Sequence, residues 1–430
     1  MLMRGAQVIV RWQDGRRFRC ESWEGLAVQN PALITLAHCG TSQAQRDLRE
    51  LRDALVAEMF AMGATQQAAA PCGGGSSGIA GCHAEDEPDC QKVLVMVGDG
   101  HQAFLDQQPA LADWAACVPT HVVLPVAPMA SKPKFSTMFP TWVGAYNAAF
   151  WSGSPAEAVP PVLGVAGITA ELPKIFISYR QAEAAGLAIQ IFDALGHAGF
   201  DVFLDHFRIP PGVNFQARLT EQLGDKSMVL FLESDTFLQS PWVTYEVNVA
   251  KTCGLGLHAL NLCDAPPISG VDEALRTRLA GSDFVGAVFG PTAVLAASKL
   301  SEVVSLVRRE HDRAIVRRRK ILEATLEGAI LGAGGSRPIP VGSGTVQINA
   351  GTGSKTYIVS VTPRPPDLPD FHRVHGQATH PTVGVVIGLS QLMEPGRHAR
   401  LSWLAGVSTL KFCDEGDMLV LGHQMVQGSL

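Results

Sequence analysis

The segment SPWVTYE, residues 240–246, places a tryptophan and a glutamate, Trp242 and Glu246, four positions apart. If the segment is helical, both side chains lie on one face, one turn apart. A carboxylate held beside an aromatic ring in a cleft can stabilise positive charge that develops on a substrate. The same spacing is also typical of a solvated helix acid behind a core tryptophan, so the pair alone leaves both interpretations open.

Other polar residues follow apolar runs that have the length of buried strands. Ser178, Tyr179 and Arg180 come at the end of KIFISYR, and Ser234 comes at the end of MVLFLES. Ligands of open parallel sheets bind at the carboxyl ends of the strands, which makes these residues candidates for a binding site. For Arg180 the alternative is a strand-end arginine in water.

The elements that must position these residues are strands alternating with helices. The expected strands are KIFISY, DVFLD, SMVLFLES, LHALNLC and DFVGAVFG, and helix-compatible sequence separates them. This alternation predicts an α/β fold with a flavodoxin-like, five-stranded parallel sheet over residues 174–320. A long last helix is expected to continue from Leu300 toward Leu331.

Stretches rich in glycine, proline or serine divide the rest of the chain. We expect a small N-terminal α/β segment at 1–65, a linker at 66–91 and a second α/β domain, of degenerate open-sheet type, at 92–151. Residues 345–430 contain alternating and β-branched runs, which predict a strand-rich C-terminal domain of unknown family.

Composition limits the class of protein. The 430 residues are 47% hydrophobic and 17% charged, which excludes wholesale disorder, and the net charge of -6 offers no general attraction to nucleic acid or anionic membranes. No apolar run has the length of a signal peptide or a membrane span, so a cytoplasmic location is expected. The nine cysteines lack a repeated spacing, which predicts reduced thiols without disulfides and no metal site.

Three motifs, KIFISYR, DVFLDHFRIPPGVNF and MVLFLESDTFLQSPWVTYE, occur in the order and spacing of a known family. Together with the five expected strands they resemble a bacterial TIR (Toll/interleukin-1 receptor) domain, over about residues 174–320 only. The resemblance implies one of two functional classes. TIR domains are either scaffolds of signalling complexes or enzymes that cleave the nicotinamide glycosidic bond of NAD.

In the enzymatic class, the resemblance implies that Glu246 is the catalytic residue. Cleavage gives the ribose oxocarbenium character, which a nearby carboxylate stabilises, and nicotinamide leaves without a general acid. The residues that the resemblance implies for substrate binding are Ser178, Tyr179, Arg180, Asp205, Phe207, Arg208, Ser234 and Trp242. Arg180 is expected to pair with the pyrophosphate and Phe207 to stack on a ring or to anchor its loop. The loop DHFRIPPG is expected to control access to the cleft and self-association.

The resemblance therefore favours an NAD nucleosidase that hydrolyses or cyclises NAD, with NAD as substrate and no cofactor. Such proteins commonly act in antiphage defence and become active through TIR–TIR contacts in a homo-oligomer, so the flanking regions are expected to sense a protein or ligand trigger. No membrane or nucleic-acid partner is expected. The alternative is a non-enzymatic TIR module, a scaffold or a mimic of host TIR signalling, in which Glu246 has no catalytic part.

Overall fold

The computed structural model describes residues 8–14, 17–24, 26, 31–67, 91–100, 121–168, 173–204, 222–342, 345–351, 355–378, 380–391 and 393–430. The chain forms two compact units. The first is made mainly by Met1–Glu171, and the second by Leu172–Val341 with Thr345–Leu430. Each unit is described by itself below.

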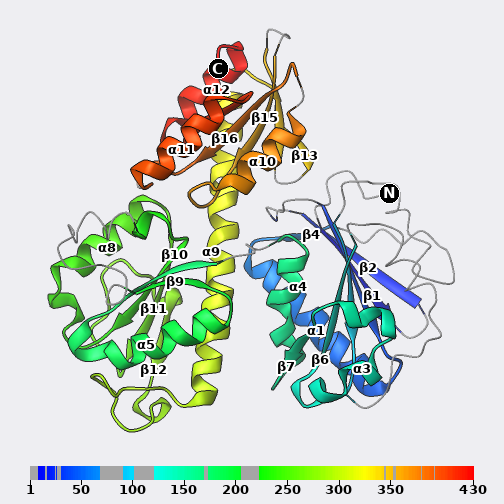
Figure 1. Ribbon diagram of the computed structural model, residues 1–430, viewed down its shortest axis with the longest axis vertical. Coiled ribbons are helices and arrows are strands. Elements are labelled where there is room, and N and C mark those ends of the chain that lie inside the picture. The colour runs from blue at the N-terminus through cyan, green and yellow to red at the C-terminus, as the bar shows by residue number, and fades with distance from the viewer. Residues whose placement is uncertain are drawn as a thin grey trace. The chain divides into compact units, whose positions relative to one another are not determined.

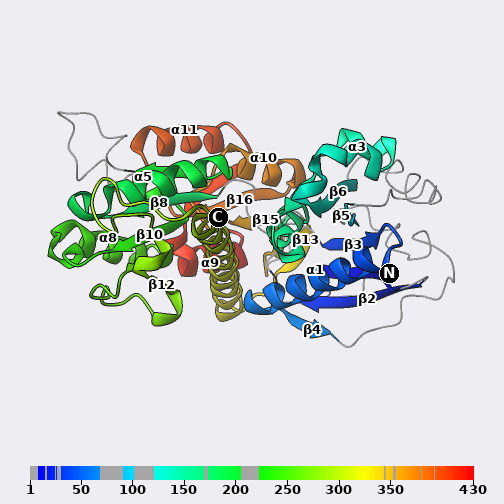
Figure 2. The ribbon, with the colours of Figure 1, turned by 90° about the horizontal axis from the view of Figure 1, so that it is seen from below.

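The first unit is built on one seven-stranded sheet in the order β4-β2-β1-β3-β5-β6-β7 (Figure 1). Its strands are β1 (Val8–Asp14), β2 (Arg17–Glu24), β3 (Ala32–His38), β4 (Thr65–Gln67), β5 (Gln91–Val97), β6 (His121–Pro128) and β7 (Ala149–Trp151). Its α-helices are α1 (Ser42–Ala61), α3 (Phe135–Met138) and α4 (Val159–Val165), and its 3-10 turns are η3 (Met129–Lys134), η4 (Thr141–Ala145) and η5 (Pro155–Ala158). Helix α1 packs against β3 and β5 (Figure 2) and also contacts α4 (Figure 1).

This sheet corrects the expected division of the N-terminal region at residues 66–91. Strands β3 and β5 pair in parallel, with Ile34 opposite Val93, so the stretches 1–65 and 92–151 belong to one sheet. The unit also continues past residue 151 through η5 and α4. Parallel pairing between distant segments leaves no local signal in the sequence, which is why two domains were expected.

The second unit contains a central domain with five parallel strands in the order β12-β11-β10-β8-β9. They are β8 (Lys174–Ser178), β9 (Asp201–Leu204), β10 (Met228–Glu233), β11 (Gly256–Leu262) and β12 (Arg276–Leu279). The flanking helices are α5 (Gln181–His197), α8 (Pro241–Thr252) and the first half of α9 (Ala297–Gly332), and short 3-10 turns are η6 (Phe237–Gln239), η7 (Glu273–Leu275) and η8 (Gly281–Asp283). The flavodoxin-like fold class predicted from the sequence is confirmed.

The fifth strand is not the one expected. DFVGAVFG, residues 283–290, forms a loop with a single bridge between Phe284 and Leu295, and the edge strand is β12, with the sequence RTRL. An edge strand needs few apolar residues because it has only one neighbour, so apolar patterning missed it.

Each face of the central sheet has its own apolar core. On one face, Ile175, Ile177 and Leu230 pack with α5 and the start of α9. On the other face, Phe176, Phe231 and the α8 residue Val247 pack together. Because side chains alternate along a strand, Ser178 shares the α8 face with Phe176.

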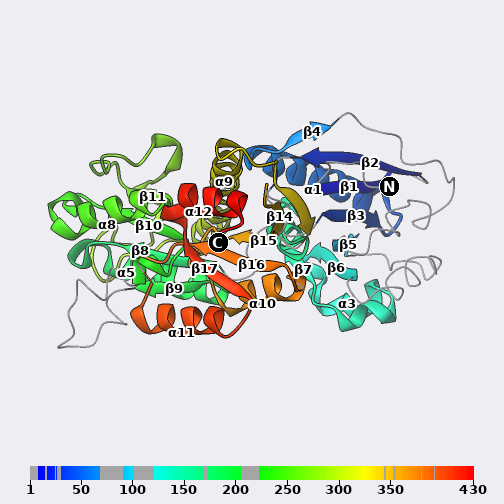
Figure 3. The same ribbon diagram turned by 90° about the horizontal axis from the view of Figure 1, so that it is seen from above.

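Helix α9 has the length expected from the sequence, and its second half packs in a C-terminal lobe, residues 339–430. The lobe's sheet has the order β13-β14-β15-β16-β17. Its strands are β13 (Ile339–Gly342), β14 (Thr345–Asn349), β15 (Thr356–Val361), β16 (Val383–Gly388) and β17 (Leu410–Asp414), and its helices are α10 (Leu368–Gln377), α11 (Pro395–Gly406), α12 (Met418–Gln427) and the turn η9 (Glu415–Asp417). The strand-rich expectation is confirmed, but helices α10 and α11 cover one face and α12 with α9 the other (Figure 3).

The cysteines differ from expectation at one position. Cys20 on β2 is disulfide-bonded. The free thiols among the described residues are Cys39, Cys253, Cys263 and Cys413. Pairing depends on which segments the fold brings together, which the spacing of scattered cysteines does not show. Among the helices within the described ranges, none has the length and apolar character that crossing a membrane requires.

Candidate functional site

The strand order of the central domain has its switch point at the carboxyl ends of β8 and β10. From β8 the chain passes to β9 on one side, and it then returns to β10 on the other side. The connections that leave β8 and β10 therefore diverge to opposite faces of the sheet, and ligands of open α/β sheets bind where this occurs. Ser178 ends β8 at this point, and Ser234 directly follows β10.

Helix α8 carries Glu246 to this edge of the sheet. Pro241 occupies the first helical position, where its missing N–H costs nothing, and Val243, Val247 and Ala250 face the core beneath. Glu246 is only 6% exposed, and the Ser178 hydroxyl donates a hydrogen bond to its carboxylate. The structure thus joins two residues that the sequence analysis selected from motifs 68 positions apart.

Trp242 lies in the first turn of α8, so the helical four-residue step from Trp242 to Glu246 is present. The side chain of Trp242 is outside the described part of the chain. Asp205, Phe207 and Arg208, which were also expected to bind substrate, fall between residues 205 and 221 and lie outside the described residues.

Arg180 and Glu183 connect the end of β8 to the loop after β10. The Arg180 guanidinium donates to the carbonyl oxygen of Thr236. Glu183, in the first turn of α5, accepts from the Thr236 amide at 3.2 Å and from the Thr236 hydroxyl. These contacts hold the loop that leads from β10 into α8, and so they support the helix that carries Glu246.

Glu183 is ionised more readily than an ordinary glutamate. Burial alone would raise its pKa, but the hydroxyls of Ser234 and Thr236, the Thr236 amide and the charge of Arg180 outweigh burial and lower that pKa. A second carboxylate therefore lies at the carboxyl edge of the sheet. Its sequence context carries no signal, because an acid in the first turn of a helix is ordinary.

Tyr179, next to Ser178, is partly buried and packs on the core formed by α5 and α9, and Glu246 is carried by α8. Ser234 is fully buried at the end of β10. Of the predicted substrate-binding residues, Ser178 contacts Glu246 directly.

A third carboxylate, Glu233, stabilises the same edge and was also missed. It is completely buried, and it accepts from the Asn261 amide at 2.7 Å, the Ile268 backbone at 2.8 Å and the Arg276 guanidinium at 2.8 Å. Because these partners come from β11, β12 and the loop between them, Glu233 fastens three strands together. With its hydrogen-bonding capacity occupied by protein groups, Glu233 is a structural residue.

The arrangement holds a buried carboxylate with a hydroxyl partner at a strand-order switch point. A carboxylate so placed can hold hydroxyl groups of a sugar and stabilise positive charge on it. No assembled second acid is needed if the leaving group departs without a proton.

The fold and this edge define a flavodoxin-like domain with its candidate site at the ends of the first and third strands. Residues 175–257 match the family model of the TIR domain. The chain therefore carries a TIR domain in its centre, and the resemblance seen in the sequence is confirmed over that region. No curated protein gives a significant match to the chain.

Proposed function

We propose that the central domain cleaves the nicotinamide–ribose bond of NAD, with Glu246 as the catalytic carboxylate. The observation that carries the proposal is the burial of the Glu246 carboxylate at the carboxyl edge of β8 and β10. A glutamate on the solvent-facing side of α8 would be exposed, whereas Glu246 is buried. TIR domains are either NAD-cleaving enzymes or scaffolds, so the TIR match leaves these two functions as candidates.

The chemistry follows from the charges of the substrate. Nicotinamide bound to ribose is cationic and leaves as a neutral molecule, so the positive charge moves onto the sugar during cleavage. Glu246 stabilises that charge and orients the ribose hydroxyls, and Ser178 holds the carboxylate in place. Attack by water then gives hydrolysis, and attack by a group within the nucleotide gives a cyclic product.

The biological setting of this reaction is part of the proposal. An enzyme that depletes NAD must be silent at rest, so we propose that self-association of the central domain activates it and that it acts as an antiphage effector. The TIR match supports a tendency to self-associate. The regions outside the central domain are then the candidates for sensing a trigger.

The rival function is a scaffold without catalysis, and one observation favours it. Glu246 already has a protein partner in Ser178, as a purely structural acid would. In that case the carboxylate only fixes α8 to β8. The two functions predict different results when the negative charge of Glu246 is removed and the shape of its side chain is kept: the enzyme loses activity, and the scaffold is unaffected.

The test compares nicotinamide release from NAD by the full-length protein and by Glu246→Gln, at concentrations where the protein self-associates. The amide keeps the size of the side chain and can still accept from Ser178, but it cannot stabilise a cation. We expect release to fall by about 100-fold or more. Asp193→Asn is the matched control, because Asp193 is an exposed acid on α5 of the same domain.

Equal release by the wild-type protein and Glu246→Gln would reject the proposed role of Glu246. Assembly without any release by the wild-type protein would favour the scaffold. Circular dichroism and thermal unfolding of both variants establish that any loss is not a loss of folding.

A further inference from the structure

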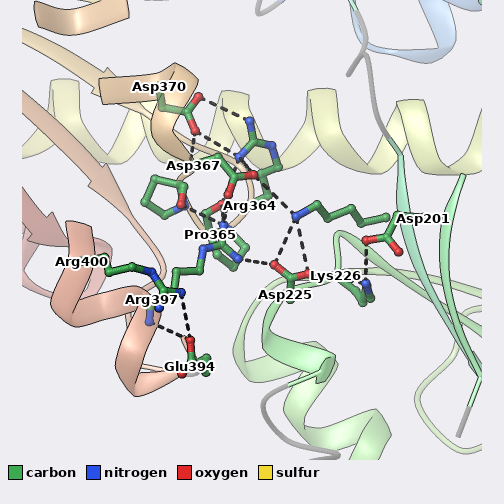
Figure 4. Close-up of polar contacts among 12 residues, drawn as sticks. Asp201, Asp225, Lys226, Arg364, Pro365, Asp367, Asp370, Glu394, Arg397 and Arg400 are labelled. Atoms are coloured by element: carbon green, nitrogen blue, oxygen red, sulfur yellow. Dashed lines mark hydrogen bonds and ion pairs between the residues drawn. The ribbon is translucent and has the colours of Figure 1, made fainter. Parts of the chain in front are cut away.

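Two reciprocal ion pairs join the central domain to the C-terminal lobe (Figure 4). Lys174 of the central domain pairs with Asp367 of the lobe, with 3.5 Å between Nζ and Oδ2. Arg397 of the lobe pairs with Asp225 of the central domain. Each side thus supplies one cation and one anion. Each cation also pairs with the acid of its own side: Lys174 with Asp225 at 3.2 Å, and Arg397 with Asp367.

The pairs are built into both sides rather than resting on the surface. Arg397 is 18% exposed and also donates to the carbonyl oxygen of Pro366 at 2.9 Å. On the other side, Lys226 is 1% exposed and pairs with Asp201 at 3.0 Å and Asp225 at 3.5 Å. Burial alone would raise the pKa of Asp225, but the charges of Lys174, Lys226 and Arg397 lower it.

The remainder of this contact is poorly packed. A cavity of about 300 Å³ lies against the pairs, and its lining includes Gln222, Met393 and Glu394. One apolar side chain of the lobe, Leu389, packs into the core of the central domain, while each side otherwise has its own core. Polar contacts with little shared core are typical of domains that move relative to each other.

The pairs also lie away from the candidate active site. Lys174 begins β8 and Asp225 precedes β10, so both are at the amino edge of the sheet, whereas Ser178 ends β8. Opening the contact would therefore expose a face of the central domain without dismantling the site. Helix α9 would keep the two parts joined, because it contributes to the cores of both.

We infer that Lys174, Asp225, Asp367 and Arg397 form an ionic latch that holds the C-terminal lobe against the central domain and restrains self-association of that domain. While the latch is closed, the lobe contacts residues at the amino ends of β8 and β10. The inference rests on the proposed function only for its effect on NAD cleavage, since closure and self-association are measured separately.

The test uses the full chain and Arg397→Glu, which places a third acid between Asp225 and Asp367. The matched control is Arg400→Glu on the same helix, because Arg400 is 72% exposed and pairs with Glu394, within the lobe, at 3.4 Å. Arg397→Gln, which removes the charge without adding one, serves if the reversal prevents folding. Hydrogen exchange at residues 222–227 and 393–397 reports closure, and sedimentation reports self-association.

We expect Arg397→Glu to exchange faster in both segments and to self-associate at about tenfold lower concentration, with Arg400→Glu behaving as the wild type. Unchanged exchange in the Arg397 variants, or the same increase in Arg400→Glu, would overturn the latch. Faster exchange without a gain in self-association would overturn its restraining role. If self-association rises as expected but no form releases nicotinamide, the latch stands and the proposed function fails.

Discussion

The hydroxyl of Ser178 and the carboxylate of Glu246 illustrate what a motif can and cannot predict at the level of single residues. Both residues could be selected from the sequence, because one follows an apolar strand and the other stands four positions after a tryptophan. Their contact could not, since it depends on β8 and β10 being neighbours. Glu183 and Glu233 gave no signal, because their roles arise only from partners far along the chain.

His258 is a buried histidine whose protonation opposes folding in acid. It is 2% exposed on β11, and its Nε2 lies 3.0 Å from the Thr277 hydroxyl. Burial lowers its pKa from 6.5 to about 4, although the charge of Glu233 acts in the opposite direction. As the pH falls below 6.5, this histidine becomes protonated in the unfolded chain but stays neutral in the folded chain. The free energy of unfolding therefore decreases until the pH reaches about 4.

We expect His258 to account for a loss of about 3 kcal/mol in the unfolding free energy of the central domain across this pH range. Glutamine does not titrate, so between pH 7 and pH 4 the unfolding free energy of His258→Gln should decrease by about 3 kcal/mol less than that of the wild type. The measurement is urea unfolding followed by hydrogen exchange of peptides from β10 and β11. His197→Gln, at an exposed position on α5, is the control and should follow the wild type. Parallel pH curves for the wild type and His258→Gln would contradict the assignment.

At the level of elements, helix α5 contains two glycines in opposite surroundings. A Cβ at Gly186 would meet the carbonyl oxygen of Pro291 at 2.5 Å and that of Ala293 at 2.8 Å. A Cβ at Gly196 would meet nothing within 4 Å. The loop before α9 thus packs directly on the backbone of α5, and the absent side chain of Gly186 is what permits this contact.

We expect Gly186→Ala to destabilise the central domain by about 2 kcal/mol, because backbone must move to admit the methyl group. Gly196→Ala should instead stabilise it by about 0.5 to 1 kcal/mol, since alanine loses less backbone entropy in a helix. Chemical unfolding of the two variants beside the wild type measures both effects. A similar change in both would show that helix propensity, rather than the packing of the loop, governs these positions.

Elements were predictable where apolar patterning determines them and not where polar partners do. Strands β8, β9, β10 and β11 are apolar runs buried on both faces, and the sequence predicted all four. Strand β12 is held partly by the pair of Arg276 with Glu233, and apolar patterning missed it. In the C-terminal lobe, the segment PRPPDLPD, residues 363–370, lies between β15 and β16 and shows no apolar period. Asp367 is the N-cap residue of α10, and Pro369 lies in the first turn of that helix.

At the level of the whole molecule, α9 makes one unit from two sheets. Val303 and Val307 pack in the core of the central domain, and Leu322, Leu326 and Ile330 pack in the core of the C-terminal lobe. The expected boundary at residue 320 cuts this helix within its length. The helix itself was predictable from its period, but its division between two cores was not, because both halves present the same apolar spacing.

Because both cores share α9, we expect the central domain and the C-terminal lobe to unfold together. Arg317→Pro tests this, since Arg317 is exposed near the middle of the helix and a proline there removes a backbone hydrogen bond at a cost of about 3 kcal/mol. Calorimetry should show the shared transition of the wild type separating into two, with hydrogen exchange assigning each to its sheet. Arg317→Ala removes the same side chain but keeps the helix, so it should retain the shared transition. A single transition in Arg317→Pro would mean that the ionic latch, rather than the continuous helix, couples the two sheets, and Arg317→Pro combined with Arg397→Gln would then separate them.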